Sequence, residues 1–216
     1  MPASSPRVAV VDYGAGNLRS VTKALERSGL RAEVCGDPAS LRNADAAVLP
    51  GVGAFANAVA SLHAKGLDDA IRDGIERGRP YLGLCLGLQL LFDSSSEHGE
   101  NAGLGLIPGR VDRFPERDAE GKPLRVPHIG WNEVRFSGEH PMLEALPERD
   151  IYYFVHSYRA KVANAAGQVG VCEYGGLEFT AAAAEGSAFA VQFHPEKSQS
   201  SGRRVLDAFA RWIDSC

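Results

Sequence analysis

A cysteine between two glycines stands where an apolar segment ends. Cys85 lies in the run GLCLG at 83–87, directly after residues 80–84, whose apolar character is typical of a buried strand. Glycine–x–nucleophile–x–glycine is the pattern of a tight strand-to-helix turn in which neighbouring backbone leaves no room for a Cβ. A helix beginning at Leu86 would direct free N–H groups at the sulfur and favour the nucleophilic thiolate. The alternative is a buried structural cysteine beside packing glycines.

A histidine and a glutamate follow another apolar segment. His194 and Glu196 flank Pro195, which we expect to hold the strand end extended. Side chains two residues apart on an extended chain project to the same side, so both can face a common partner. With Cys85 they predict a catalytic triad in which the carboxylate orients the ring and the ring accepts the thiol proton. The alternative is a strand-end histidine bonded to a surface glutamate.

The loop PGVG at 50–53 follows a third apolar segment. In a doubly wound sheet it would lie beside the Cys85 turn, because ligands gather at the carboxyl ends of the strands. The loop can direct the N–H of Val52 or Gly53 at a developing oxyanion, with the Leu86 N–H as the second donor. An ordinary tight turn and a phosphate site are the alternatives, although a complete phosphate-binding motif is lacking here and in the glycine-rich turn at 14–16.

The elements that must position these residues alternate in the first half of the chain. We predict strands at 8–11, 32–35, 46–49 and 80–84, and helices after Asn17, which is the expected N-cap, after Asp37, at 54–63, at 67–77 and at 87–92. This alternation predicts βαβ units, and therefore an α/β fold with a doubly wound, mostly parallel central sheet and flanking helices.

The second half is rich in strand-like segments. They lie at 111–114, 131–136, 151–158, 169–174, 177–183 and 188–193, and an amphipathic helix at 203–213 closes the chain. We expect several of these strands to pair antiparallel at one side of the sheet, and the last to return to the catalytic centre. The prediction is one domain over 1–216, with residues 1–6 as a flexible N-terminal extension.

Composition narrows the classes of function. The 216 residues carry a formal net charge of −4, which argues against a general nucleic-acid or membrane-surface role. The four cysteines, at 35, 85, 172 and 216, form neither a C-x-x-C motif nor a metal-like grouping. The first seven residues lack the apolar region of a signal peptide, and no apolar stretch reaches the ~18 residues of a membrane span. We therefore expect a cytoplasmic protein with free thiols and no bound metal.

Several segments together resemble a known enzyme family. GLCLGLQLLF around Cys85, and VQFHPEKS around His194 and Glu196, resemble the triad segments of class I (triad-type) glutamine amidotransferases. Within that family, four further segments resemble the glutaminase subunits of imidazole glycerol phosphate synthases. They are DYGAGNLRSV near the start, LPGVGAF at 49–55, HIGWN at 128–132 and YYFVHSY at 152–158. The resemblance extends from residue 8 to residue 212.

The resemblance implies a reaction in two places. Glutamine would be hydrolysed to glutamate and ammonia through a thioester on Cys85, without a cofactor. The ammonia would pass to a separate (β/α)8-barrel cyclase subunit, which makes imidazole glycerol phosphate and an aminoimidazole carboxamide ribotide in histidine biosynthesis.

The resemblance also assigns residues around the triad. The implied glutamine-binding positions are Gly53, Gln89, Val155, His156 and Ser157. The implied subunit interface and ammonia gate consist of Asn17, Trp131, Tyr153 and Lys197. Without the resemblance, His128 and Trp131 would be interpreted as core residues.

Three other functions compete with this interpretation. The first is a glutaminase domain serving anthranilate, aminodeoxychorismate, guanylate or pyridoxal phosphate synthesis, which HIGWN, PGVGAF and YFVHSY together disfavour. The second is a cysteine peptidase or γ-glutamyl hydrolase, which activity without a partner would reveal. The third is a binding module with an inactive triad, against which the presence of all three triad residue types argues.

Overall fold

The computed structural model describes residues 5–216 of the chain. Of the predicted extension at 1–6, residues 1–4 lie outside the described residues, and the Pro6 carbonyl accepts a hydrogen bond from the Arg31 N–H at 3.2 Å. Within the described residues, no helix is long and apolar enough to cross a membrane.

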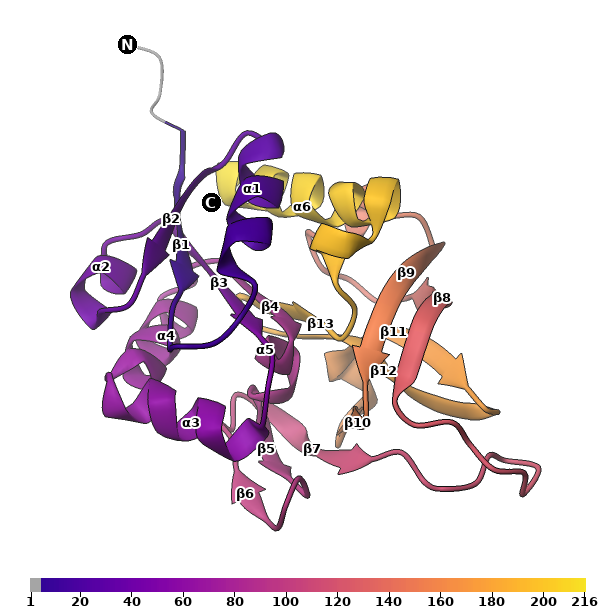
Figure 1. Ribbon diagram of the computed structural model, residues 1–216. Coiled ribbons are helices and arrows are strands. Elements are labelled where there is room, and N and C mark those ends of the chain that lie inside the picture. Colours follow the sequence, from indigo (N-terminus) through magenta and orange to yellow (C-terminus); the bar gives the residue numbers. More distant parts are fainter. Residues whose placement is uncertain (1–4) are drawn as a thin grey trace.

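The parallel half of the sheet comes first along the chain (Figure 1). Its strands, in spatial order, are β2 (Arg31–Cys35), β1 (Arg7–Val11), β3 (Ala46–Gly51), β4 (Tyr81–Cys85) and β13 (Ala188–Val191). Every neighbouring pair in this set is parallel. The last strand returns from the far end of the sequence to lie beside β4, with Val191 opposite Leu84. The predicted fold class and the return of the last strand are therefore confirmed.

The remaining strands extend and branch the sheet, mostly with antiparallel pairing. They are β12 (Leu177–Glu185), β10 (Tyr158–Val162), β7 (Ile107–Arg113), β5 (Phe92–Ser95) and β6 (Asn101–Ala102), with a branch formed by β11 (Gln168–Tyr174), β8 (His128–Phe136) and β9 (Arg149–His156). Only β5 and β7 pair parallel in this part of the described chain. The branch places β9 close to the segment after β13, where the Tyr153 carbonyl meets the His194 N–H.

Helices cover the two faces of the parallel half (Figure 1). On one face lie α1 (Leu18–Arg27) and α6 (Gln199–Asp214), and on the other α2 (Pro38–Arg42), α3 (Phe55–Ala64) and α4 (Leu67–Glu76). Single-turn 3-10 helices span Leu143–Ala145, Ala165–Gly167 and Pro195–Lys197. Alternate residues of β1 serve the two cores: Val8 and Val10 face one, and Ala9 and Val11 face the other. This period of two explains why the strand is apolar throughout.

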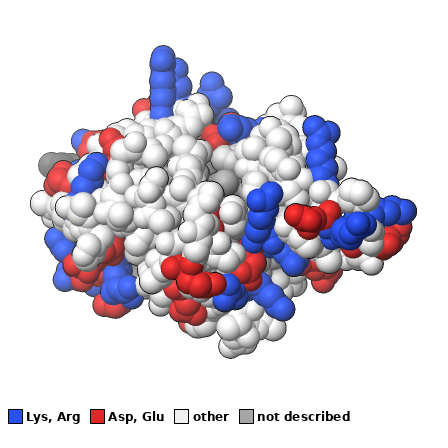
Figure 2. Space-filling model, turned by 60° about the horizontal axis from the view of Figure 1, so that its bottom comes forward, with Lys and Arg blue, Asp and Glu red and all other residues white. Residues whose placement is uncertain are grey.

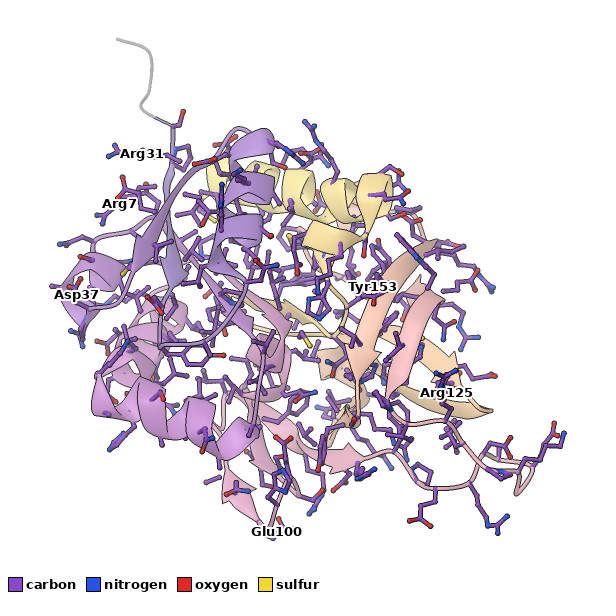
Figure 3. The ribbon with its side chains drawn as sticks, viewed as in Figure 1. Arg7, Arg31, Asp37, Glu100, Arg125 and Tyr153 are labelled. Atoms are coloured by element: carbon purple, nitrogen blue, oxygen red, sulfur yellow. The ribbon has the colours of Figure 1, made fainter. Side chains whose placement is uncertain are left out.

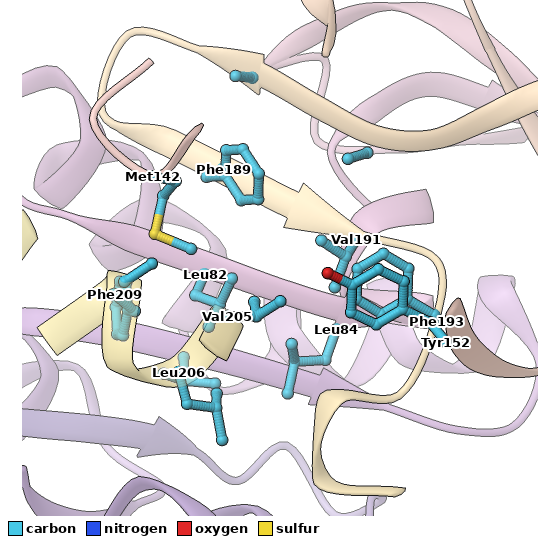
Figure 4. Close-up of a cluster of buried hydrophobic side chains, with 14 of the residues drawn as sticks. Leu82, Leu84, Met142, Tyr152, Phe189, Val191, Phe193, Val205, Leu206 and Phe209 are labelled. Atoms are coloured by element: carbon cyan, nitrogen blue, oxygen red, sulfur yellow. The ribbon is translucent and has the colours of Figure 1, made fainter. Parts of the chain in front are cut away.

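The packing of α6 anchors the segment that carries the histidine. Figure 4 shows side chains of α6 against β4 and β13; they are Val205, Leu206 and Phe209 from the helix, and Leu82, Leu84, Phe189 and Val191 from the strands. Complete burial of such a side chain contributes about 1.5–3 kcal/mol. Because α6 begins shortly after His194, this packing limits how far the histidine can move.

Several predicted elements differ in the structure. The helix predicted at 87–92 is only the four-residue α5 (Leu86–Gln89), and the chain re-enters the sheet at Phe92. The segment is buried on all sides, so its apolar residues show no period that separates helix from strand. The strand predicted at 151–158 is interrupted at Ser157, and α6 begins at Gln199 rather than at residue 203. Asn17 precedes α1 as expected, but its side chain forms no capping hydrogen bond.

Candidate active site

The turn at Cys85 depends on the absence of two side chains. A Cβ on Gly83 would lie 2.6 Å from the Gly87 carbonyl oxygen, and one on Gly87 would lie 1.9 Å from the Leu49 carbonyl oxygen. Cys85 itself has φ 55 and ψ −104, a conformation that costs a non-glycine residue about 1–3 kcal/mol. The glycines thus let the surrounding backbone close on the turn and hold the cysteine in this strained conformation. Steric necessity explains the GLCLG pattern.

The histidine and the glutamate are in direct contact. His194 Nδ1 lies 2.9 Å from Glu196 Oε1, and the two side chains are 5% and 4% exposed. The expected extended backbone is wrong beyond His194, because Pro195–Lys197 forms a 3-10 turn. Proline fixes φ near the value that such a turn needs, and the turn brings the carboxylate back to the ring. The contact between His194 and Glu196 was predicted correctly, although the extended conformation from which it was predicted is wrong.

Backbone hydrogen bonds tie the histidine to β9. The His194 N–H donates to the Tyr153 carbonyl at 3.0 Å. The Ser198 hydroxyl donates to the His194 carbonyl at 2.7 Å and accepts from the Tyr153 N–H at 3.0 Å. The role of Ser198 was not predicted, because nothing about a serine after the HPEK segment indicates a contact with a strand elsewhere in the fold. Ser198 is buried, and it links His194 to the neighbouring strand β9.

The electrostatics of the site favour a charged histidine. Burial lowers the pKa of His194, but the Cys85 and Glu196 side chains outweigh burial and raise that pKa to about 9. Within the described residues, His194 Nε2 has no hydrogen-bond partner, and it is the ring nitrogen that Glu196 leaves free. The ring therefore has a proton to give to a group bound beside Cys85.

Cys85 and His194 line one cavity of about 370 Å³. All the residues predicted to bind glutamine or an oxyanion also line it, namely Val52, Gly53, Leu86, Gln89, Val155, His156 and Ser157. It is further lined by Gly51, Glu97, Pro127, Tyr158 and Lys197. A larger cavity of about 970 Å³ lies at the amino ends of β1 and β3, away from the triad. The smaller cavity is the candidate site, because Cys85 and His194 line it and neither lines the larger one.

Two buried histidines lie next to each other at this cavity, which His156 lines and His128 does not. His156 Nδ1 lies 2.8 Å from the Tyr158 carbonyl oxygen, and His156 Nε2 lies 3.0 Å from His128 Nδ1. A carbonyl only accepts, so each ring carries its proton on Nδ1. Burial lowers the pKa of His128 to about 4 and that of His156 to about 3. Both rings are neutral, and His128, stacked on Tyr174 with ring centroids 4.1 Å apart, packs as a core residue.

The four predicted interface residues gather near the triad. Tyr153 on β9 (Figure 3) lies opposite Trp131 on β8, with ring centroids 5.9 Å apart, and Lys197 Nζ lies 5.9 Å from the Tyr153 ring. Asn17 lines a cavity of about 20 Å³ together with His194, Glu196 and Lys197. Trp131 is 49% exposed, and its exposed neighbours Ile129 and Ile151 extend an apolar surface on β8 and β9.

The described residues on the face shown in Figure 2 form no extended patch of one charge that would indicate a binding surface. Lysine and arginine side chains are interspersed there with aspartate and glutamate, and neither sign covers a continuous area of the face shown. This distribution agrees with the modest net charge of −4.

The sheet order, the strained cysteine turn and the paired histidine and glutamate define a triad-type amidotransferase. The family described as "Glutamine amidotransferase class-I" matches residues 9–211, and the chain belongs to this family. Within it, the chain is similar to the imidazole glycerol phosphate synthase subunit HisH of Moorella thermoacetica, with 48% identity over 206 residues and 95% of each chain covered. The corresponding subunit of Methylococcus capsulatus is 46% identical over 210 residues, covering 95% of this chain and 96% of the relative.

Solved structures of distant proteins share the fold. PurLQS from Thermotoga maritima has a TM-score of 0.75 at 20% identity, with 97% of this chain and 100% of that chain covered. The glutaminase domain of Trypanosoma brucei CTPS with bound acivicin has a TM-score of 0.70 at 18% identity, with 98% and 94% covered. At these identities the likeness shows the fold alone.

Proposed function

We propose that the chain is the glutaminase subunit of an imidazole glycerol phosphate synthase, and that residues 1–216 form one glutamine amidotransferase domain. The observation that carries this proposal is that Cys85 and His194 line one cavity of about 370 Å³ while Glu196 contacts His194 Nδ1. Relatives that are named as subunits of this synthase match 95% of the chain at 48% identity, which supports the choice within the family.

The triad accounts for hydrolysis in two steps. The Cys85 sulfur attacks the side-chain carboxamide carbon of glutamine, and His194 gives its Nε2 proton to the departing ammonia, leaving a thioester. The ring, now neutral, then removes a proton from water, whose oxygen attacks the thioester carbon. The C–S bond breaks, glutamate leaves, and Cys85 is regenerated as the thiolate beside His194, which keeps the proton taken from water. Glu196 stabilises the charged ring through the 2.9 Å contact to Nδ1.

The developing oxyanion is assigned to the loop beside the cysteine. Gly51 lies directly opposite Cys85 in the β3–β4 register, so the N–H groups of Val52 and Gly53 follow at the edge of the site. The second donor is the Leu86 N–H. Because α5 has only four residues, we attribute stabilisation to this N–H itself and not to a long helix dipole. One such donor contributes about 3–4 kcal/mol in the transition state.

The same loop can serve as a gate. Gly53 has φ +99, a value that glycine adopts freely, so the neighbouring peptide can present either its carbonyl or its N–H to the site. Such a rotation exchanges backbone hydrogen bonds worth about 1 kcal/mol each, which is less than the oxyanion donor contributes. A partner that pushes on Asn17, Tyr153 and Lys197 can therefore change the rate by orders of magnitude without moving the triad.

The partner is proposed to be a (β/α)8-barrel cyclase subunit that receives the ammonia. It would cover the apolar surface of β8 and β9 around Trp131, which is half exposed in the isolated chain. Gly53, Gln89, Val155, His156 and Ser157 would hold the glutamine. The complex would act in the cytoplasm, in histidine biosynthesis.

A glutaminase assay of the chain tests this proposal. Glutamate release is measured for the chain alone, with the cyclase subunit, and with the cyclase and its nucleotide ligand; the complex of the Cys85→Ala chain is the control. We expect near-inactivity alone and strong activation by the ligand-loaded cyclase. High rates that are unchanged by the cyclase and nucleotide would contradict the gate. Absence of glutamate release in all three combinations would contradict the function.

A further inference from the structure

A buried amide touches the nucleophile. Gln192 follows β13 directly and is 0% exposed, and β13 lies beside β4, whose last residue is Cys85. Gln192 Nε2 donates to Cys85 Sγ at 3.5 Å, and Gln192 Oε1 accepts from Gln89 Nε2 at 3.0 Å. The side chain therefore joins the sulfur to a residue of the proposed glutamine site. A glutamine after an otherwise apolar strand is the sequence signal, because a buried amide must find partners.

The orientation of both amides is fixed by one carbonyl. Gln89 Nε2 also donates to the Tyr158 carbonyl oxygen at 3.2 Å, and that oxygen accepts from His156 Nδ1 as well. A carbonyl oxygen has two lone pairs and no hydrogen, so Gln89 must turn its NH2 group toward Tyr158. Its second N–H then meets the oxygen of Gln192, and Gln192 is left with its NH2 group facing Cys85.

This polarity determines what Gln192 can do for the sulfur. An N–H group directed at Sγ stabilises the thiolate more than the neutral thiol, because hydrogen bonds to ionised acceptors are about twice as strong. The donor directly follows β13 and is held by Gln89, so its position does not depend on whether the oxyanion loop is correctly formed. The contact also restrains the direction in which Sγ faces the cavity.

We propose that Gln192 is a positioning residue for Cys85, acting through an N–H···S hydrogen bond whose direction the Tyr158 carbonyl sets through Gln89. This inference rests on the proposed role of Cys85 as nucleophile. It predicts that Gln192 controls the reactivity of the thiolate and not only the binding of glutamine.

Alkylation of Cys85 measures this role without glutamine turnover. The rate of iodoacetamide labelling of Cys85 is followed against pH by peptide mass spectrometry, in a Cys216→Ser background because Cys216 is the exposed cysteine of the described residues. In Gln192→Glu the Gln89 contact is retained, but the donor is replaced by a negative oxygen. Gln192→Met removes both contacts at similar volume. The matched control is Gln168→Glu. Gln168 lies on β11, and its amide also acts as a donor, because Gln168 Nε2 donates to Thr180 Oγ1 at 2.9 Å.

We expect the labelling midpoint of Gln192→Glu to move upward by about one to two pH units, with a smaller upward shift in Gln192→Met and none in Gln168→Glu. In the complex with the cyclase and its nucleotide, kcat should fall about 10- to 100-fold in both Gln192 variants. Unchanged labelling profiles in both, with thermal unfolding like that of the parent, would overturn the proposal even if glutaminase activity is present. A raised KM with unchanged kcat and labelling would assign Gln192 to substrate binding and overturn it equally. Absence of glutaminase activity in the parent, with the labelling shifts intact, would instead contradict the proposed function alone.

Discussion

The two halves of the proposed triad are held in place by different means. Cys85 is positioned by its immediate neighbours, because Gly83 and Gly87 let the surrounding backbone approach to distances that a Cβ would forbid. His194 is positioned through a strand that is distant in the sequence: its N–H donates to the Tyr153 carbonyl, and the nearby Ser198 hydroxyl links its carbonyl to the Tyr153 N–H. Steric contacts therefore hold the turn that carries Cys85 rigid. The segment that carries His194 is instead coupled to β9, where the proposed partner surface lies. Changes on the two sides should have different consequences.

Loss of the nucleophile has the largest expected effect. Cys85→Ala should lower glutaminase activity by several orders of magnitude, as removal of a nucleophile does in other triads. The variant should keep its fold and its binding to the cyclase, since the side chain faces a cavity. Glutamate release and a cyclase binding assay check both parts. Alanine at Cys35 or Cys172 serves as the control and should change stability only; substantial activity in Cys85→Ala would refute the mechanism.

The two partners on the histidine side should differ in effect. His194→Ala removes the proton carrier and should lower kcat by several orders of magnitude. Glu196→Gln can still accept a hydrogen bond from Nδ1 through its amide oxygen, so orientation is partly kept and the loss should be smaller. Steady-state kinetics of both variants in the complex make the comparison. Equal and complete losses would show that the carboxylate does more than orient and stabilise the ring.

Adding one methyl group at Gly87 tests whether steric contacts position the Cys85 turn. Gly87→Ala puts a Cβ 1.9 Å from the Leu49 carbonyl oxygen and should lower the free energy of unfolding by about 3 kcal/mol. Gly74→Ala in α4 is the matched control, because no heavy atom lies within 4 Å of its Cβ, and it should stabilise by about 0.5–1 kcal/mol. Denaturant titration measures both. A Gly87→Ala protein as stable as the parent would remove the steric argument.

Coupling on the histidine side should produce a moderate effect. Ser198→Ala removes the hydroxyl between the His194 carbonyl and the Tyr153 N–H, and each lost hydrogen bond is worth about 1 kcal/mol. We expect kcat to fall about tenfold, with activation by the cyclase reduced by a similar factor. Glutaminase rates with and without the ligand-loaded cyclase measure both. An unchanged activation ratio would show that β9 does not transmit the signal through this contact.

The pKa values of His194 and His140 should be shifted in opposite directions from the ordinary value. The pKa of His194 is raised to about 9, whereas burial against Phe189 and Trp212 lowers that of His140 to about 4. The contribution of His194 to stability is thus present below its unfolded pKa of about 6.5 and is lost as pH rises through 9. His140 should cost stability as pH falls from about 6.5 toward 4. NMR titration of the ring protons checks both directions, and a neutral His194 at pH 7 would contradict this assignment.

The sequence predicts best those features that depend on neighbours in the chain. The Cys85 turn and the period-two burial of β1 follow from the local order of glycines and apolar residues. Segments buried on every side are harder to assign, and Phe92 was placed in a helix because its neighbourhood shows no polar face. The pairing of His194 with Glu196 was predicted, but the 3-10 turn that makes it was not, because proline is compatible with both conformations.

Contacts formed only by the fold could not be predicted from the residues. Ser198 and Gln192 are polar residues beside motif residues, and their roles depend on β9 and β4 lying next to them. The glutamine-binding positions were reached only through resemblance to the family. Their convergence on one cavity depends on strands far apart in sequence.

Covalent labelling with an electrophilic glutamine analogue tests the central claim most directly. The complex with the cyclase and its nucleotide is treated with the analogue, and labelling of each cysteine is compared with the remaining glutaminase activity. We predict that activity falls in proportion to modification of Cys85 and that glutamine protects this residue. Full modification of Cys85 with activity retained, or complete inactivation with Cys85 unmodified, would contradict the account.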